Sequence, residues 1–478
     1  MGLEAGVRRM TRRVVVIGGG IAGLAAAHRA VEVGRERGAP VDVTLLEADT
    51  RVGGVIRTER TDGFVIEAGP DSFLTERPWA TGLCERIGLT PRLIGTRGEH
   101  RKTYVVHDGE LHGLPDGFLL MAPTQFMPLV QSKLFSWPGK LRMAADLVLP
   151  RRGGQTDESL ADFVTRRLGR EALERVVQPL IGGIYTADPE QLSLAATMPR
   201  FLDLERDRRS IIWAMWSEQR RAASAPRERS GARWSLFTTV DDGLQSLVDT
   251  IAQRLPDGLV RLGRAVRSIE RSDAWRIMTD SGERFDADAV VVATPAHQAA
   301  KLLRGLDEKL ASELEEIGYA SSAIVTAAFD EKQIGRPLDG FGFVVPFIEQ
   351  RSILACSYSS VKYEGRAPQG RVLIRCFVGG ALQPEMLQRD DAALLAAVRG
   401  ELADLLHITG EPLLARVTRW HRSMAQYRVG HLDKLQRIDA LLAPHRSLFL
   451  AGNAYRGVGI PHCIHSGETA AEAALDAR

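Results

Sequence analysis

VVVIGGGIAGLAAA, residues 14–27, joins four apolar β-forming residues to a run of small residues through three successive glycines. A second apolar run, VDVTLLEA at residues 41–48, follows. The pattern predicts a βαβ unit with strands at 14–17 and 41–48 and a helix at 21–37. In Gly18-x-Gly20-x-x-Gly23, the glycines permit a tight turn, close approach of a pyrophosphate, and packing of the helix on the strand. The stretch therefore predicts a dinucleotide site; a glycine turn that binds no ligand is the alternative.

The residues after the second strand indicate which dinucleotide is bound. Glu47 ends that strand, where a carboxylate can accept hydrogen bonds from the adenosine ribose. An NAD fingerprint ends at this acid, whereas here Arg51 and the pair Gly53-Gly54 follow. They suit a second close pass of the backbone along the pyrophosphate, with a guanidinium to balance its charge. The spacing therefore favours FAD, although a surface ion pair is the alternative for Arg51.

The composition excludes several other classes of protein. The chain has 478 residues, of which 44% are hydrophobic, and its net charge is +2. Neither a nucleic-acid partner nor a transmembrane helix is expected, because there is no excess of positive charge and no uninterrupted apolar run of ~18 residues. The four scattered cysteines form no CxxC pair, so we expect no disulfide framework, no metal site and a cytoplasmic location. Residues 1–13 carry no recognisable targeting signal.

The rest of the chain alternates between helical and strand patterns. Residues 94–231 predict amphipathic helices, with a polar excursion at 217–233. A meander of strands is expected from residue 259, and further strands at 319–378. A helix over 390–407 and a terminal strand, loop and helix complete the prediction. The chain is thus expected to begin a nucleotide-binding fold, leave it twice and return to it.

Several segments resemble a known family. GGGIAGLAAA (18–27), EADTRVGG (47–54), GFVIEAGPDSF (63–73) and LFLAGNAYRGVGIPHCIHSGETAA (448–471) are similar to the amine-oxidase-type flavoproteins and, within them, to the porphyrinogen oxidases of haem synthesis. The segments 113–150, 178–201 and 417–431 resemble the bacterial coproporphyrinogen III oxidases among these. The resemblance runs from residue 14 to the C-terminus.

The resemblance implies an α/β fold in three parts. A Rossmann-like FAD-binding domain (1–62, 232–297 and 430–478) would be interleaved with a mixed α/β substrate domain (63–93 and 298–429). A helical domain (94–231) would cover the cleft. For the apolar stretch 114–141, a cleft lid and core is the preferred interpretation and weak contact with a membrane surface is the alternative.

The resemblance also assigns site residues. Non-covalent FAD is implied, because the attachment cysteine of flavin-linked amine oxidases has no counterpart in SMAQYRVGH (423–431). For Trp420, a core aromatic is the alternative to a place beside the flavin. The positions implied to contact FAD are Gly18, Gly19, Gly20, Ile21, Ala22, Gly23, Glu47, Ala48, Arg51, Gly53, Gly54, Gly69, Pro70, Asp71, Ser72, Val266, Trp420, Val458, Gly459 and Ile460.

By the same resemblance, the chain would oxidise coproporphyrinogen III to coproporphyrin III, with oxygen becoming hydrogen peroxide. Arg77 is the first candidate to anchor a propionate and Lys102 the second; a solvated arginine at a helix start is the alternative for Arg77. No catalytic residue is assigned.

Protoporphyrinogen IX is the alternative substrate. An amine oxidase, a carotenoid desaturase and a non-catalytic porphyrin carrier are further alternatives, and hand-over of the product to ferrochelatase is left open.

Four histidines and one cysteine invite other interpretations. His462 and His465 have a spacing that could bind metal on a helix, but no acid or thiolate accompanies them, so a polar helix start is preferred. His421 and His431 flank Tyr427, and each could tune the flavin or move a proton. A satisfied structural histidine is preferred for both. Cys463 is expected to be a small buried hydrophobic residue.

Overall fold

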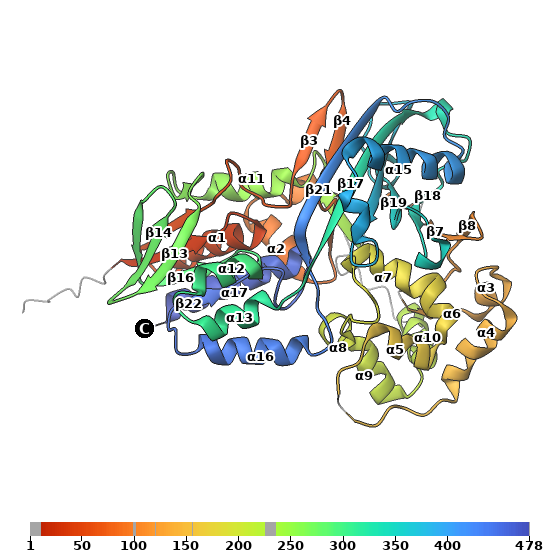
Figure 1. Cartoon of the computed structure of the whole chain (residues 1–478), viewed down its shortest axis with the longest axis horizontal. Coiled ribbons are helices and arrows are strands. Elements are labelled where there is room, and N and C mark those ends of the chain that lie inside the picture. Colours follow the sequence, from red (N-terminus) through yellow and green to blue (C-terminus); the bar gives the residue numbers. More distant parts are fainter. Residues whose placement is uncertain (1–10, 99–101, 120, 155, 225–235, 478) are drawn as a thin grey trace, which may run out of the picture.

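A five-stranded parallel sheet forms the centre of one half of the molecule (Figure 1). The computed structural model describes residues 11–98, 102–119, 121–154, 156–224 and 236–477. The βαβ unit predicted from the glycine-rich stretch is present, with α1 at Ile21–Glu36. The strands, in spatial order, are β12 (Val260–Arg261), β2 (Val41–Leu46), β1 (Arg12–Ile17), β16 (Ala289–Val292) and β22 (Leu448–Leu450).

Both faces of this sheet are buried, as a parallel sheet requires. Val14 and Val16 point to the face covered by α1, α2 (Pro78–Arg86), α11 (Gln245–Arg254) and α17 (Ile460–Asp476). Val15 and Ile17 point to the opposite face. That face is covered by helices and an antiparallel three-stranded sheet: α12 (Ala296–Leu303), α13 (Glu308–Glu315), α16 (His431–Leu442), β13 (Val266–Arg271), β14 (Trp275–Thr279) and β15 (Arg284–Ala287).

A seven-stranded sheet forms the centre of the other half. Two of its strands, β17 and β21, are long and extend towards the first half (Figure 1). Helix α15 (Asp391–Leu406) packs on one face, while the other face meets a helical layer. In spatial order the strands are β21 (Leu414–Ala425), β17 (Tyr319–Asp330), β20 (Arg371–Gly379), β19 (Ala355–Tyr358), β18 (Gly340–Val344), β7 (Lys102–His107) and β8 (Glu110–Gly113).

The helical layer begins later than expected. The prediction of helices from residue 94 is wrong for 102–113, where β7 and β8 form a hairpin in the seven-stranded sheet. The Asp108-Gly109 turn has φ of 51° and 76°, a two-residue hairpin signal that the sequence interpretation missed. The longer helices of the layer are α3 (Phe126–Gln131), α4 (Trp137–Ala144), α5 (Leu160–Arg167), α7 (Gln178–Tyr185), α9 (Pro199–Arg208) and α10 (Ile211–Ser224).

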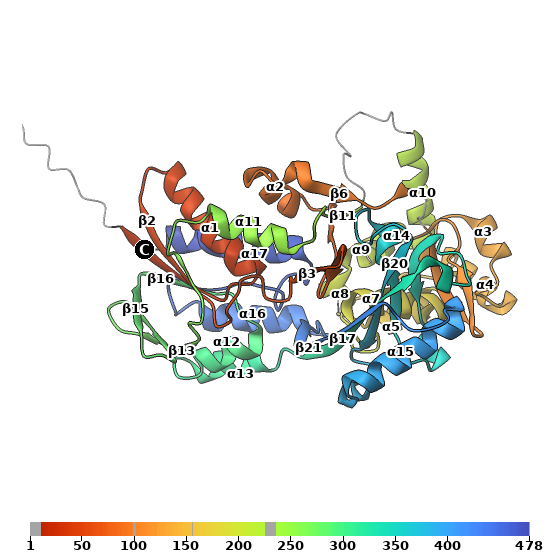
Figure 2. The same ribbon diagram turned by 90° about the horizontal axis from the view of Figure 1, so that it is seen from above.

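Shorter elements connect these layers. The segment before α7 is a π-helix at Leu173–Val177. Seen from above, β6 (Leu93–Gly95) and β11 (Phe237–Val240) lie between α2 and α10 (Figure 2). The remaining short strands and helices are β3 (Thr58–Thr61), β4 (Phe64–Glu67), β5 (Phe73–Leu74), β9 (Phe118–Leu119), β10 (Ala122–Pro123), α6 (Arg170–Ala172), α8 (Leu194–Thr197) and α14 (Ser359–Lys362).

The other predicted patterns compare with the structure as follows. The meander after residue 259, the strands within 319–378, the helix near 390–407 and the final strand, loop and helix are confirmed. Residues 1–10, and 225–233 of the polar excursion, lie outside the described residues. Within the described part, no helix has both the length and the apolarity to cross a membrane. The division into three domains stays a prediction.

Candidate active site

The glycine-rich turn between β1 and α1 is closely packed on one side. Gly18 has φ of 105°, and its N–H donates to the Leu46 carbonyl at 2.8 Å. A Cβ on Gly23 would lie 1.8 Å from the Gly18 carbonyl oxygen, so no larger residue fits. These two glycines therefore hold the helix against the strand, as predicted.

The other side of the turn is open. A Cβ on Gly20 would meet nothing within 4 Å. Gly20 is the N-cap of α1 and provides no side chain to bond the first N–H groups of the helix. The nearby Thr294, whose methyl group would contact a Cβ on Gly18, has a buried hydroxyl without a hydrogen-bond partner. An open backbone, free helix N–H groups and an orphaned hydroxyl fit the pyrophosphate of FAD.

The second glycine pair lies directly beside the first. The Gly53 N–H donates to the Gly19 carbonyl at 2.8 Å, and Gly20 and Gly53 form a parallel bridge. Arg51 donates to the carbonyls of Val52 at 2.9 Å and Ile56 at 3.0 Å, and also to that of Gly54. Burial lowers the pKa of Arg51. Arg51 thus braces its own loop, in addition to any attraction for a pyrophosphate.

Glu47 lies where the ribose acceptor was predicted. Its carboxylate accepts from the Gly19 N–H at 2.5 Å and the Asp49 N–H at 2.7 Å, and a carboxylate retains capacity for further donors. The Glu47 carbonyl accepts from the Arg264 N–H at 2.7 Å. This bond brings the start of β13, with half-buried Val266, beside the exposed Ala48. The residues predicted for the adenosine end are therefore close together.

The segment Gly69–Ser72 rests on a buried charged network. Asp71 accepts from the Ser72 hydroxyl at 2.7 Å and pairs with Lys362 at 3.1 Å and Arg375 at 3.3 Å. Burial opposes ionisation of Asp71, but the two cations outweigh it and hold its pKa well below its usual range. Arg375 is only 1% exposed, and it also donates to the Gly69 carbonyl. Sequence reasoning missed both cations; the arginine within the apolar strand RVLIRCFV was the available signal.

Trp420, on β21, contacts the residue just before this segment. Its indole N–H donates to the Ala68 carbonyl at 2.6 Å. A bulge follows, where the register of β17 and β21 shifts and Arg422 adopts φ of 43°. Bulges redirect side chains next to functional sites. Trp420 is half-buried and bonds to the residue immediately before the predicted flavin segment, and its place beside the flavin stays a prediction.

The loop before α17 is held by Tyr427. The Tyr427 hydroxyl donates to the Asn453 carbonyl at 2.7 Å and accepts from the Gly457 N–H at 2.8 Å. His431 stacks on Tyr427 at 4.0 Å, and its Nε2 lies 2.9 Å from the Tyr455 carbonyl. Burial lowers the pKa of His431 and raises that of Tyr427. The structural interpretation of His431 is therefore confirmed.

The loop leads into the predicted flavin-side residues Val458, Gly459 and Ile460. Gly459 is the N-cap of α17, and no side chain caps this helix start. Cys463 is buried, and burial raises the pKa of its thiol to about 12. The prediction of a small buried residue is confirmed for Cys463, and all four cysteines are free.

The two predicted substrate anchors differ in their surroundings. Arg77 is exposed at the N-cap of α2, with its guanidinium carbon 5.8 Å from the centre of the Trp79 ring. Lys102 is also exposed, but its ammonium pairs with Asp339 at 2.8 Å. Their proximity to a bound substrate stays a prediction.

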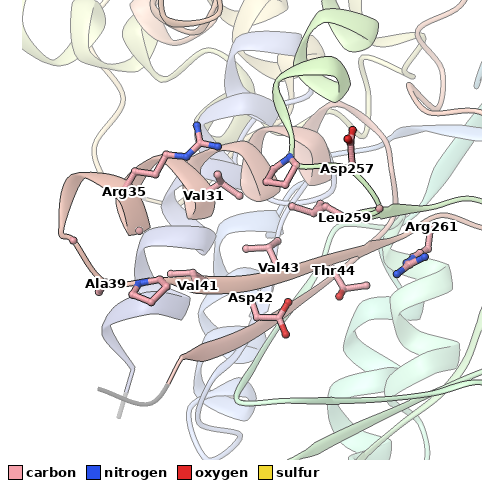
Figure 3. Close-up of a pocket in the computed structure, with 15 residues that line it drawn as sticks. Val31, Arg35, Ala39, Val41, Asp42, Val43, Thr44, Asp257, Leu259 and Arg261 are labelled. Carbon is pink, nitrogen blue, oxygen red and sulfur yellow. The ribbon is translucent and has the colours of Figure 1, made fainter. Parts of the chain in front are cut away.

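Two cavities lie away from the glycine-rich turn. One of about 390 Å³ is lined by Asp188, Tyr319, Tyr427, Arg428 and the exposed His421. A second, of about 550 Å³, lies along β2, between the end of α1 and residues 256–261 (Figure 3). None of the predicted cofactor residues lines this second cavity.

One group of side chains bears on the predicted absence of a metal. The ligand atoms of His107, Asp108 and Glu349 lie within 4.8 Å of one another. Both ring nitrogens of His107 are 3.6 Å from a carboxylate oxygen, and Glu349 already accepts from the Asp108 and Gly109 N–H groups. Contacts within the chain therefore account for the position of these side chains, and the absence of a metal stays a prediction.

Comparisons with known proteins place the chain in a family. The profile of the family described as "Flavin containing amine oxidoreductase" matches residues 21–475. The chain is similar to the coproporphyrinogen III oxidases of Bacillus subtilis (36% identity, 97% of this chain and 98% of the relative) and Staphylococcus aureus (33%, 97% and 99%). A crystal structure from an Exiguobacterium species superposes with a TM-score of 0.85 at 33% identity, covering 97% of this chain and 99% of the other. The chain thus belongs to the flavin-containing amine oxidoreductases and, within them, to the porphyrinogen oxidases, and its cofactor is FAD.

Proposed function

We propose that this protein oxidises coproporphyrinogen III to coproporphyrin III, with oxygen as the electron acceptor and hydrogen peroxide as the second product. The observation that carries the proposal is the similarity, over 97% of the chain, to three bacterial proteins named coproporphyrinogen III oxidase, at 33–36% identity. The open cradle at Gly20 and the uncapped starts of α1 and α17 support the use of FAD.

When bound, FAD supplies an acceptor for hydride equivalents from the macrocycle. The chain's own residues would hold and orient it. The α1 N-terminus would bind the pyrophosphate, Glu47 the ribose, and the N–H groups at the start of α17 an electron-rich edge of the flavin. Each pair of hydrogen atoms removed from the substrate reduces one oxygen molecule to one hydrogen peroxide molecule, so the overall reaction balances.

Arg77 is proposed to bind a propionate of the substrate. Its guanidinium is exposed and, among the residues that the structure describes, forms no ion pair. Lys102 is the weaker candidate because Asp339 already neutralises its ammonium. Of these two side chains, Arg77 is therefore the one whose positive charge is available to a carboxylate of the substrate.

Protoporphyrinogen IX is the alternative substrate. Plant relatives named protoporphyrinogen oxidase share 27–30% identity with the chain, less than the three bacterial relatives, whereas the Exiguobacterium structure, named a putative protoporphyrinogen oxidase, shares 33%. An amine substrate has weaker support, since a structure of putrescine oxidase matches at 17% identity with a TM-score of 0.66 and shows the fold alone.

Anaerobic bleaching of the flavin tests the proposal. The purified holoenzyme is mixed without oxygen with coproporphyrinogen III or protoporphyrinogen IX, and the visible flavin absorbance is followed. We expect faster bleaching by coproporphyrinogen III. Absence of bleaching by both would overturn the proposal, and faster bleaching by protoporphyrinogen IX would favour the alternative.

The cellular setting is also proposed. Four unpaired cysteines suit a reducing cytoplasm. Weak contact with a membrane surface would use α3 and α4, where Met127, Trp137 and Leu141 are more than 60% exposed beside Lys140. Co-sedimentation with anionic vesicles tests this contact, and the Trp137→Ser variant should no longer co-sediment.

Hand-over of the porphyrin to ferrochelatase would appear as faster metal insertion when both proteins are mixed.

A further inference from the structure

Three basic side chains gather around one indole where α2 meets the first turns of α17. The His465 ring stacks on Trp79 with a centroid distance of 4.2 Å and an interplanar angle of 0°. The His462 ring meets the same indole edge-on at 5.2 Å. Arg77 places its guanidinium carbon 5.8 Å from the indole centre. We call Arg77, Trp79, His462 and His465 the indole cluster.

The charge of the indole cluster is not neutralised by its neighbours. Arg77 and His465 form no ion pair within the described ranges, and Glu468 on α17 is bound to Arg86. Burial lowers the pKa of His462, and the positive charges of Arg77 and His465 lower it further, whereas Glu76 opposes the shift. Glu76 is exposed and is the one acid that acts on His462. A bound anion would relieve this repulsion between the cations.

The indole cluster is accessible and adjoins the predicted flavin-side loop. Arg77 and His465 are exposed, while Trp79 and His462 are half-buried. The His462 ring packs against the loop so closely that a Cβ on Gly457 would lie 2.4 Å from its Cγ. A solute bound at the cluster would therefore lie within a helical turn of Gly459 and Ile460.

We propose that Arg77, His462 and His465 form a subsite for one ionised carboxylate of the substrate, with Trp79 as its apolar wall. The inference rests on the proposed function and extends it from one arginine to a site with three basic side chains. Histidine gains its charge within the range of about pH 8 to 5. Because a bound carboxylate favours the charged form of an adjacent imidazole, binding should strengthen as the pH falls, as long as the carboxylates remain ionised.

Binding of coproporphyrin III, measured by quenching of porphyrin fluorescence on the FAD-loaded protein, tests the subsite. His465→Gln and His462→Gln remove one basic ring each and keep a polar side chain. His445→Gln is the matched control, because His445 lies 3.0 Å from its own carboxylate partner, Asp307, outside the cluster. Coproporphyrin tetramethyl ester, which has no ionised carboxylate, is the control ligand.

We expect His465→Gln to raise the dissociation constant of coproporphyrin III about threefold near pH 6. His462→Gln should act in the same direction. His445→Gln should have no effect, and the ester should bind all variants equally. Unchanged binding in both cluster variants near pH 6, or an equal loss for the ester, would overturn the inference.

The outcome separates this inference from the proposed function. Wild-type protein that is bleached by coproporphyrinogen III while both cluster variants bind the porphyrin normally would refute the subsite alone. Wild-type protein that neither binds the porphyrin nor is bleached would refute both. Flavin absorbance of each variant shows whether its fold and cofactor are retained.

Discussion

Replacing Tyr427 by phenylalanine tests whether the loop before α17 depends on a single hydroxyl. That hydroxyl donates to the Asn453 carbonyl at 2.7 Å and accepts from the Gly457 N–H at 2.8 Å. Tyr427 is 2% exposed, so water does not reach the site freely. Tyr427→Phe keeps the ring and its stacking on His431, and removes only the two hydrogen bonds.

The expected cost follows from the two groups left unpaired. A buried donor or acceptor without a partner costs about 1–3 kcal/mol, so the two together should lower the free energy of unfolding by about 2–4 kcal/mol once the loop relaxes. Tyr455→Phe provides the control. Tyr455 is 5% exposed and two residues from Gly457, but its buried hydroxyl has no hydrogen-bond partner. Because a buried hydroxyl without a partner is itself unfavourable, its removal should not lower the free energy of unfolding and should raise it by up to about 1–3 kcal/mol.

The assay is urea unfolding of both holoenzymes, followed by the rise in fluorescence as FAD is released. Tyr427→Phe should release FAD at a clearly lower urea concentration than wild type, and its visible flavin spectrum should shift because the loop no longer has one fixed position. Tyr455→Phe should release FAD at the same or a higher urea concentration than wild type, with an unchanged flavin spectrum. Equal urea midpoints for the two variants would refute the claim that the Tyr427 hydroxyl holds this loop.

Four further predictions concern the cofactor, the substrate and pH. Acid precipitation should release FAD into the supernatant; flavin retained in the pellet would show a covalent link. Gly20→Val should fold but lose most of its FAD, because its side chain would fill the open side of the turn; full FAD content in this variant would contradict the assignment. Arg77→Ala should raise KM for coproporphyrinogen III about tenfold, equivalent to about 1.4 kcal/mol, with little change in kcat, and an unchanged KM would move the anchor elsewhere. Because the folded-state pKa of Asp71 is depressed, its stabilising contribution is complete above about pH 4 and is lost as the pH falls further. Melting curves should show that Asp71→Asn weakens this acid dependence, and an unaltered acid slope would show that Asp71 does not cause it.

Local sequence signals predicted the parts of the fold that depend on neighbours in the chain. The turn at Gly18–Gly23 was predictable because a positive φ and a close helix–strand contact each demand glycine at a fixed position. The alternation of Val14 to Ile17 between two buried faces follows from strand geometry. The hairpin at 102–113 had an equally local signal in Asp108-Gly109, so this error came from giving weight to the helical pattern around it.

The ion pairs that hold Gly69–Ser72 could not be predicted from local sequence patterns. Lys362 and Arg375 reach Asp71 from elements about 300 residues away in the chain. An arginine in an apolar strand signals a buried partner, but it does not say which carboxylate supplies it. Only the pairing of β20 with β17 and β19 brings Arg375 under the Gly69 carbonyl.

The interpretation of His462 and His465 on α17 changes once the residues around them are known. Their spacing alone suggested a metal site or a polar helix start, because ligands and solvated residues follow the same helical period. The structure adds Trp79 from α2 and Arg77 at its N-cap, and among the described residues Glu76 is the one carboxylate that acts on His462. A metal would be repelled by the guanidinium, whereas a carboxylate would be attracted by all three basic groups. The chemistry of the cluster therefore follows from the packing of α2 against α17, which the spacing of His462 and His465 does not encode.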